Sequence, residues 1–190
     1  MRKTLLTLAL GLAVAGTAHA QSFKAKLDGF NAAGVPIATN ANGNAQIEVI
    51  DGGTAIRFKV NVSGIDNLLM AHIHLSPVPL PVDPTGTAAG PIAFWFAGSP
   101  RTRLDAEGEA IPATTNTQTV NGRLAEGFIL TDGQLEGTVT VTSLIAALCE
   151  QRGSVVVHTD DLDPNTPTGV AGDSRAGELR GTIVPIQPCR

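Results

Sequence analysis

The sequence predicts an all-β fold, a β-sandwich with one short helix, and three observations support this prediction. Apolar and polar residues alternate along several short segments, as they do along a strand with one face in a core. Turns rich in Gly, Pro and Asn separate these segments. Seven or eight short strands in a chain of 190 residues are typical of one sandwich domain.

The strands are expected at regular intervals after residue 20. In AIRFKVNVSGI (55–65), the apolar Ile56 and Phe58 share one face and the charged Arg57 and Lys59 share the other. A hairpin is expected between this segment and AQIEVI, because Asp51-Gly52-Gly53 supplies residues that tolerate positive φ at its turn. The remaining strand segments are SFKAKLDGF (22–30), LLMAHIHL (68–75), PIAFWF (91–96), GFIL (127–130), QLEGTVTV (134–141), SVVVH (154–158) and ELRGTIVPI (178–186).

One helix and two long loops interrupt the strands. SLIAALCEQRG (143–153) has Leu144 and Leu148 at helical spacing, with Ser143 expected as the N-cap and Gly153 as the stop signal. The loops span residues 76–91 and 160–177, and both are rich in Pro and Gly. Function in a sandwich is carried mainly by such loops.

The first twenty residues have the features of a signal peptide. A basic start is followed by an apolar run that is short for a membrane span, and AHA before Gln21 is a small-x-small cleavage site. We therefore expect export, a periplasmic or secreted location, and a single domain over residues 21–190. No later run approaches the ~20 apolar residues of a membrane helix.

The charge of the chain argues against nucleic-acid binding. Its 13 basic and 17 acidic residues give a net charge of −4, and removal of the first twenty residues lowers the basic count to 11. The chain has no basic run, no Tyr and one Trp, so the electrostatic footprint of a nucleic-acid-binding protein is missing.

The two cysteines, Cys149 and Cys189, are expected to form a disulfide. An even pair in an exported protein is most simply bridged, and the absence of CxxC spacing disfavours a redox-active pair. The bridge would close a loop of about 40 residues and attach the C-terminus, stabilising the fold by ~2–4 kcal/mol.

Three histidines form the candidate site. Alternation in LLMAHIHL places His72 and His74 on the face opposite the leucines, and in SVVVHTDD it places His158 opposite the core valines. If these strands are neighbours, three imidazoles would meet, with Asp160 or Asp161 beside them as outer acceptors. Imidazole sets suit Cu, Zn, Fe and Ni. The alternative is a structural role, in which the histidines bond loop carbonyls and fix the 76–91 loop.

The loop after His158 carries Asp160, Asp161, Asp163 and Asp173. Calcium binding by these carboxylates is conceivable, but their spacing matches no EF-hand pattern. A solvated loop with Asx-turns is favoured. There is also no GxSxG motif, so hydrolase chemistry is disfavoured.

The chain resembles the CHRD domain, the module named after chordin. The resemblance rests on MAHIHL and GP, followed far downstream by LIAALCEQRGSVVVHTDDLDP and GELRGTI, and it covers about Phe23 to Ile183. It implies an extracellular or periplasmic immunoglobulin-like β-sandwich from a family whose biochemical role is mostly undefined.

A second resemblance is to copper–zinc superoxide dismutase, a Greek-key sandwich. HIH and VVVHTDDL match its copper-binding segments, which implies His72, His74 and His158 as copper ligands, and AGDSR matches a segment that implies Arg175 as an anion-steering residue. Arg180 is the alternative for that role, because the length of the loop before the last strand does not decide which arginine aligns with that family's arginine. In AAGPIAF, Ile92 stands where the metal-bridging histidine of that family would be, so dismutase activity is disfavoured.

Two functional hypotheses follow. The first is an exported CHRD-type binding or structural module without established catalysis, whose ligand or extracellular protein partner is undefined. The second is a periplasmic copper-binding or redox protein related to superoxide dismutase, with copper as its cofactor at the three histidines.

Overall fold

The computed structural model describes residues 21–98, 119–161, 165 and 169–189. The predicted signal peptide therefore lies outside the described residues, as does Asp163. The described part contains nine strands and one α-helix: β1 (Ser22–Leu27), β2 (Asn42–Ile50), β3 (Ala55–Ile65), β4 (Leu68–Leu75), β5 (Ile92–Ala97), β6 (Val120–Ile129), α1 (Val141–Cys149), β7 (Gly153–Thr159), β8 (Leu179–Thr182) and β9 (Val184–Pro185).

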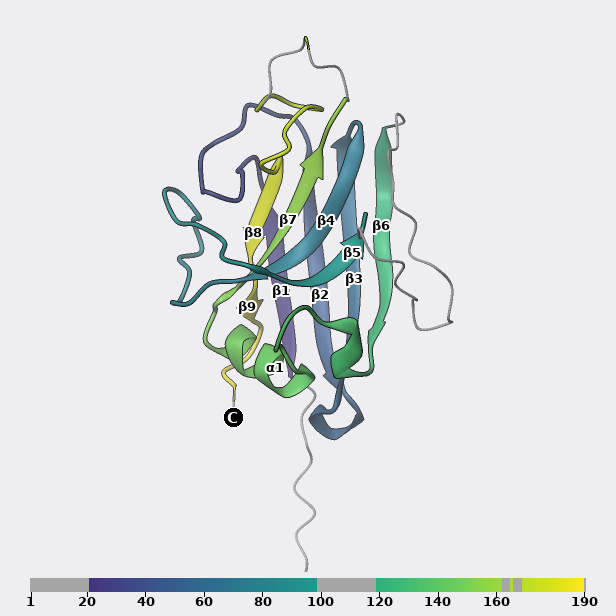
Figure 1. Ribbon diagram of the computed structural model, residues 1–190, viewed down its shortest axis with the longest axis vertical. Helices are drawn as coiled ribbons and strands as arrows, with labels where there is room; N and C mark the ends of the chain where they lie inside the picture. The colour runs from purple at the N-terminus through teal and green to yellow at the C-terminus, as the bar shows by residue number, and fades with distance from the viewer. Residues whose placement is uncertain (1–20, 99–118, 162–164, 166–168, 190) are drawn as a thin grey trace, which may run out of the picture.

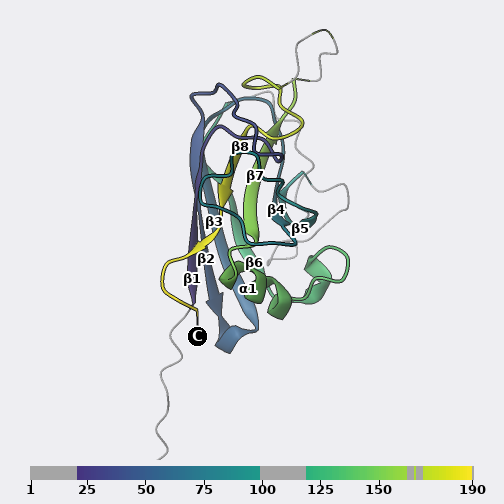
Figure 2. The same ribbon diagram turned by 90° about the vertical axis from the view of Figure 1, so that its left-hand side faces the viewer.

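The strands form two antiparallel sheets that pack face to face (Figures 1 and 2). One sheet has the order β6-β3-β2-β1-β9 and the other has the order β5-β4-β7-β8. The connections β3–β4, β5–β6, β6–β7 and β8–β9 each pass from one sheet to the other. The predicted all-β sandwich with one short helix is confirmed.

Alternating residues of both sheets fill the core between them. In β3, Ile56 and Phe58 are buried while Arg57 and Lys59 are exposed, as the sequence predicts. The ring of Phe58 packs against Phe94 of β5, with 5.2 Å between the ring centroids. Contacts of this kind across the sheets bury the apolar faces that drive folding.

The β2–β3 hairpin turns at the predicted position. Asp51, Gly52 and Gly53 form a short 3₁₀ turn in which all three residues have positive φ, of 50°, 67° and 99°. Glycine adopts this left-handed region without a steric penalty, so the Gly-Gly pair allows the tight reversal that sets the strand register.

The segment 134–141 differs from its prediction as a strand. Asp132–Gln134 form a 3₁₀ turn, and Thr140 caps a helix that begins at Val141. Ser143 is therefore not the N-cap: it is the third residue of a capping box, in which its backbone N–H donates to Thr140 Oγ1 and its hydroxyl accepts from the Thr140 N–H. Gly153 begins β7, after Gln151 has turned the chain with φ 56°.

The predicted disulfide is present. Cys149, the last residue of α1, is bonded to Cys189, with 5.7 Å between their Cα atoms. The bridge ties the C-terminal segment after β9 to the helix that caps one end of the sandwich (Figure 1). Within the described residues, no helix has the length and apolar composition that crossing a membrane requires.

Candidate metal centre

The structure brings the three predicted histidines together on neighbouring strands. His72 and His74 lie on β4 and His158 lies on β7, and the antiparallel register pairs Met70 with His158 and His74 with Ser154. Because directly opposed residues share a face of a sheet, all three imidazoles project from the outer face of the four-stranded sheet. We refer to His72, His74 and His158 as the histidine cluster.

The imidazole rings of this cluster are close enough to share one ion. The ring centroid of His72 lies 4.5 Å from that of His74 and 4.5 Å from that of His158, and the centroids of His74 and His158 are 6.4 Å apart. One ring nitrogen from each residue can be chosen so that all three lie within 4.8 Å of one another. Two nitrogens bound to one ion at about 2.0–2.1 Å lie at most about 4.2 Å apart, so this spacing is close to that of a three-histidine site.

Three covering loops, residues 28–41, 76–91 and 169–178, bury this outer face. The 76–91 loop crosses β8, where the hydroxyl of Thr182 donates to the carbonyl of Pro81 at 2.6 Å. Ala32 joins the loops, because its N–H donates to Ala176 and its carbonyl accepts from Ala89. In Figure 1 the loops gather on the β8 side and at the end of the sandwich opposite α1. The histidine side chains are consequently only 1–8 % exposed.

Backbone carbonyls of two covering loops fix the tautomers of two histidines. Nδ1 of His74 lies 2.6 Å from the carbonyl oxygen of Gly90, and Nδ1 of His158 lies 2.7 Å from that of Arg175. Since a carbonyl oxygen only accepts, each Nδ1 carries the proton and donates it. Each neutral ring therefore keeps a lone pair on Nε2, as a metal ligand requires.

Each ring of the cluster has one buried nitrogen that could bind a metal. Among the described residues, Nδ1 of His72 and Nε2 of His74 and His158 are buried without a hydrogen-bond partner. Buried polar atoms are almost always paired, because leaving one unpaired costs about 1–3 kcal/mol. Three unpaired nitrogens, one from each ring, fit a transition metal of the copper or zinc class.

Burial also keeps the cluster uncharged. Burial, together with the smaller effects of the nearby His158 and His74 as like charges, lowers the pKa of His72 to about 2. Burial lowers the pKa of His158 to about 4, against the opposing effect of the Arg175 carbonyl. The pKa of His74 is also lowered, chiefly by burial. Neutral imidazoles are the form that binds metals.

The alternation pattern did not reveal two further contributors, Trp95 and Gly90. The indole of Trp95 on β5 packs edge-on against His72, with 4.8 Å between ring centroids, and its N–H donates to Glu136 at 2.9 Å. Trp95 is the single tryptophan and shares the outward face with the cluster, a signal that alternation in PIAFWF contained. Gly90 was not identifiable, because its role depends on the path of the 76–91 loop.

Ile92 begins β5 and is paired with His74 across the β4–β5 ladder. A hydrocarbon side chain at this position adds no ligand, so the described residues supply three imidazoles and no fourth beside them. A metal held by these three histidines would have a coordination position open to a small ligand.

Asp160, one of the two aspartates predicted to accept hydrogen bonds from the histidines, is linked to His158 through Arg175. The carboxylate of Asp160 pairs with Nε of Arg175 at 2.5 Å, and it is the backbone carbonyl of Arg175 that accepts from His158. Asp160 and Asp161 also approach Asp173, with carboxylate oxygens within 4.8 Å of one another. Asp160 thus holds the loop segment that orients His158.

The two arginines that were candidates for anion steering have different environments. The side chain of Arg175 is 62 % exposed and is paired with Asp160. Arg180 lies on β8, is 1 % exposed, and donates from Nη1 to the carbonyls of Ala32 and Thr87. The structure therefore separates a surface arginine from one that is buried under the covering loops.

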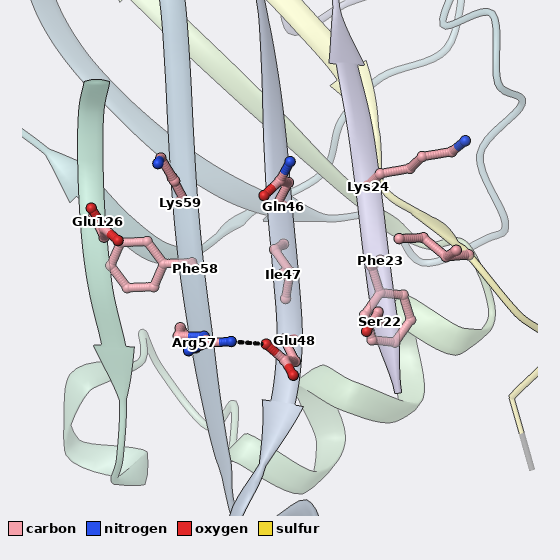
Figure 3. A pocket seen from close by; sticks show the side chains of 11 residues that line it. Ser22, Phe23, Lys24, Gln46, Ile47, Glu48, Arg57, Phe58, Lys59 and Glu126 are labelled. Carbon is pink, nitrogen blue, oxygen red and sulfur yellow. Dashed lines mark hydrogen bonds and ion pairs between the residues drawn. The ribbon is translucent and has the colours of Figure 1, made fainter. Parts of the chain in front are cut away.

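A shallow pocket on the five-stranded sheet lies away from the cluster. Figure 3 shows Lys24, Gln46 and Lys59 along its outer surface, with Arg57 of β3 paired to Glu48 of β2. Its charged side chains are of both signs and mostly exposed, so they define no specific ligand.

The fold and the site together define a β-sandwich with a buried histidine cluster. The profile of one family, the CHRD domain, matches residues 23–183, which is most of the chain, and the chain therefore belongs to this family. CHRD domains are typical of extracellular and periplasmic proteins. A comparison with curated proteins finds no match.

Proposed function

We propose that this CHRD domain is a metal-binding module that holds one copper ion through His72, His74 and His158. The observation that supports the proposal is the set of three buried nitrogens without partners, one on each ring. Zinc fits the same donors, but the Irving–Williams order places copper above zinc at a nitrogen site. The disulfide agrees with an oxidising compartment outside the cytoplasm, and we include a periplasmic or secreted location in the proposal.

The proposed role is binding rather than superoxide dismutation. The resemblance to superoxide dismutase places Ile92, which pairs with His74, at the position of that family's metal-bridging histidine, so the imidazole that such a redox cycle would need is missing there. In the metal-loaded protein the three histidines would hold the ion, and the Gly90 and Arg175 carbonyls would keep two of the rings in the binding tautomer.

Trp95 provides a direct test, because it is the only tryptophan and it contacts His72. Copper(II) added to the metal-free protein is expected to quench Trp95 fluorescence until one equivalent is bound, with copper content measured in parallel. The variant His74→Gln should lose most of this binding. Glutamine keeps an uncharged polar side chain in the cluster but supplies no imidazole nitrogen.

Asp161→Asn is the matched control, because it alters the neighbouring acidic group and leaves the cluster intact. It should bind copper as the unchanged protein does. Substoichiometric copper, or binding that survives in His74→Gln and disappears in Asp161→Asn, would remove the metal proposal. The structural role of the histidines would then be the better explanation.

A further inference from the structure

A second unsatisfied polar group lies beside the histidine cluster, on β8. The side chain of Arg180 is 1 % exposed, and its Nη1 donates to the carbonyls of Ala32 and Thr87. Its Nε and Nη2 are buried and have no hydrogen-bond partner among the described residues. These two nitrogens form one edge of the guanidinium, with parallel N–H groups that suit a two-oxygen acceptor.

The positive charge of Arg180 also lacks an ion-pair partner in the described part of the chain. Glu178, two residues earlier, uses its carboxylate elsewhere: one oxygen accepts from Thr39 at 2.6 Å, and the other accepts from Thr159 at 2.9 Å and from the N–H of Gly172 at 2.7 Å. Burying an unpaired charge is costly, and buried charges in proteins are normally paired. A counter-anion would remove this cost.

Ser154 of β7 adds another free donor on the same face. Its hydroxyl is buried and has no partner among the described residues. The register pairs Ser154 with Thr182 and Val156 with Arg180, so Ser154 and Arg180 are diagonal neighbours. Such neighbours lie about 7–8 Å apart, a distance that a long arginine side chain and one small anion would span.

We propose that Arg180 and Ser154 form a binding site for one small planar oxyanion of the carboxylate or bicarbonate type. Nε and Nη2 of Arg180 donate to its two oxygens, and the hydroxyl of Ser154 donates to one of them. The covering loops bury the site, which limits the anion to a few atoms. Because Ser154 is also paired with His74, the anion lies beside the histidine cluster, but its binding does not require a metal.

Thermal denaturation of the metal-free protein tests this site without relying on copper. Formate is the probe, with bicarbonate as a second anion and sodium chloride at equal ionic strength as the reference. A ligand that binds only the folded state raises the midpoint temperature with concentration. We expect formate and bicarbonate to raise the midpoint above the chloride curve in a saturable way.

Two variants locate the effect. Arg180→Lys keeps the charge but loses the paired Nε and Nη2 donors that bind two oxygens at once, so the apparent affinity for formate should fall at least tenfold. Ser154→Ala removes one donor with little change in volume and should weaken binding several-fold, which keeps the test available if Arg180→Lys fails to fold. Arg57→Gln, a change at an exposed arginine on β3 of the five-stranded sheet, should leave formate binding unchanged.

Coincident formate and chloride curves would overturn the proposal, and Arg180 would then serve only to tie the loops to β8. Equal formate binding in the unchanged protein and in Ser154→Ala would also overturn it, as would loss of binding in Arg57→Gln alone. A formate effect in protein that fails to bind copper would support the anion site and count only against the metal proposal.

Discussion

Gly90 is the residue on which the orientation of His74 depends. Its φ of 91° lies in the left-handed region, and a Cβ added there would lie 2.1 Å from the carbonyl oxygen of Leu75. No side chain fits without displacing the backbone that carries the acceptor for Nδ1 of His74. Gly90 therefore links the path of the 76–91 loop to the tautomer of a candidate ligand.

The substitution Gly90→Ala should be destabilising beyond the cost of its backbone conformation. A positive φ alone costs an alanine about 1–2 kcal/mol, and the clash with Leu75 should raise the loss to about 3 kcal/mol or more. Gly86→Ala is the control, because Gly86 has φ 70° in the same loop and its added Cβ would meet nothing within 4 Å. Urea unfolding of both variants measures the difference, and equal losses would contradict this account of Gly90.

The sequence does not predict which of Arg175 and Arg180 is buried, although it does predict the outward faces of the histidines. Alternation placed His72, His74 and His158 on outward faces without knowledge of the fold, and the structure does place them there. Which arginine is buried depends on how the loop of residues 76–91 crosses β8. Long-range loop paths of this kind leave no periodic signal in the sequence.

At the scale of elements, strands were predictable because one face of each is in the core and the other is not. The prediction of a strand at residues 134–141 was wrong because Val139, Thr140 and Val141 form a β-branched run that favours a strand locally. In the structure, Val141 begins α1 and is buried there. Tertiary packing and the capping hydroxyls outweighed a weak local preference.

The N-cap of α1 can be tested directly. Thr140 accepts the N–H of Ser143 at 3.0 Å, and Thr140→Ala should lower the free energy of unfolding by about 1 kcal/mol, the usual cost of a lost N-cap. Thr142→Ala is the matched change at an exposed helical position, where alanine is the better helix former, so it should be neutral or slightly stabilising. Chemical denaturation distinguishes the two, and a larger loss in Thr142→Ala would contradict the capping assignment.

At the scale of the whole molecule, the disulfide restricts the unfolded chain. It closes a loop with a sequence separation of 40 residues, for which chain entropy gives a stabilisation of about 4 kcal/mol. The double variant Cys149→Ala/Cys189→Ala should lose about that much unfolding free energy. Reduced wild-type protein measured under the same conditions should match the variant, and a loss below about 1 kcal/mol would show that the bridge contributes little.

The buried histidine cluster makes the stability of the metal-free fold depend on pH. Unfolded histidines have a pKa near 6.5, whereas burial lowers the pKa of His72 to about 2 and that of His158 to about 4. Below pH 6.5 the unfolded chain therefore binds protons that the folded protein does not bind. Stability is fully present above pH 6.5 and is lost as the pH falls, by about 1.4 kcal/mol per pH unit for each such histidine.

Urea unfolding at pH 7, 6 and 5, in the presence of a chelator, measures this dependence. His72 and His158 together should remove about 4 kcal/mol between pH 7 and pH 5, and His74 acts in the same direction because its pKa is also lowered. Most carboxylates titrate below this window, so the loss reports on the histidines. The variant His72→Gln removes one titrating ring. The change in unfolding free energy between pH 6 and pH 5 should therefore fall by about 1.4 kcal/mol per pH unit, the contribution of one proton. A stability that stays constant from pH 7 to pH 5 would mean that the folded cluster accepts protons as readily as the unfolded chain does, which contradicts its burial beneath the covering loops.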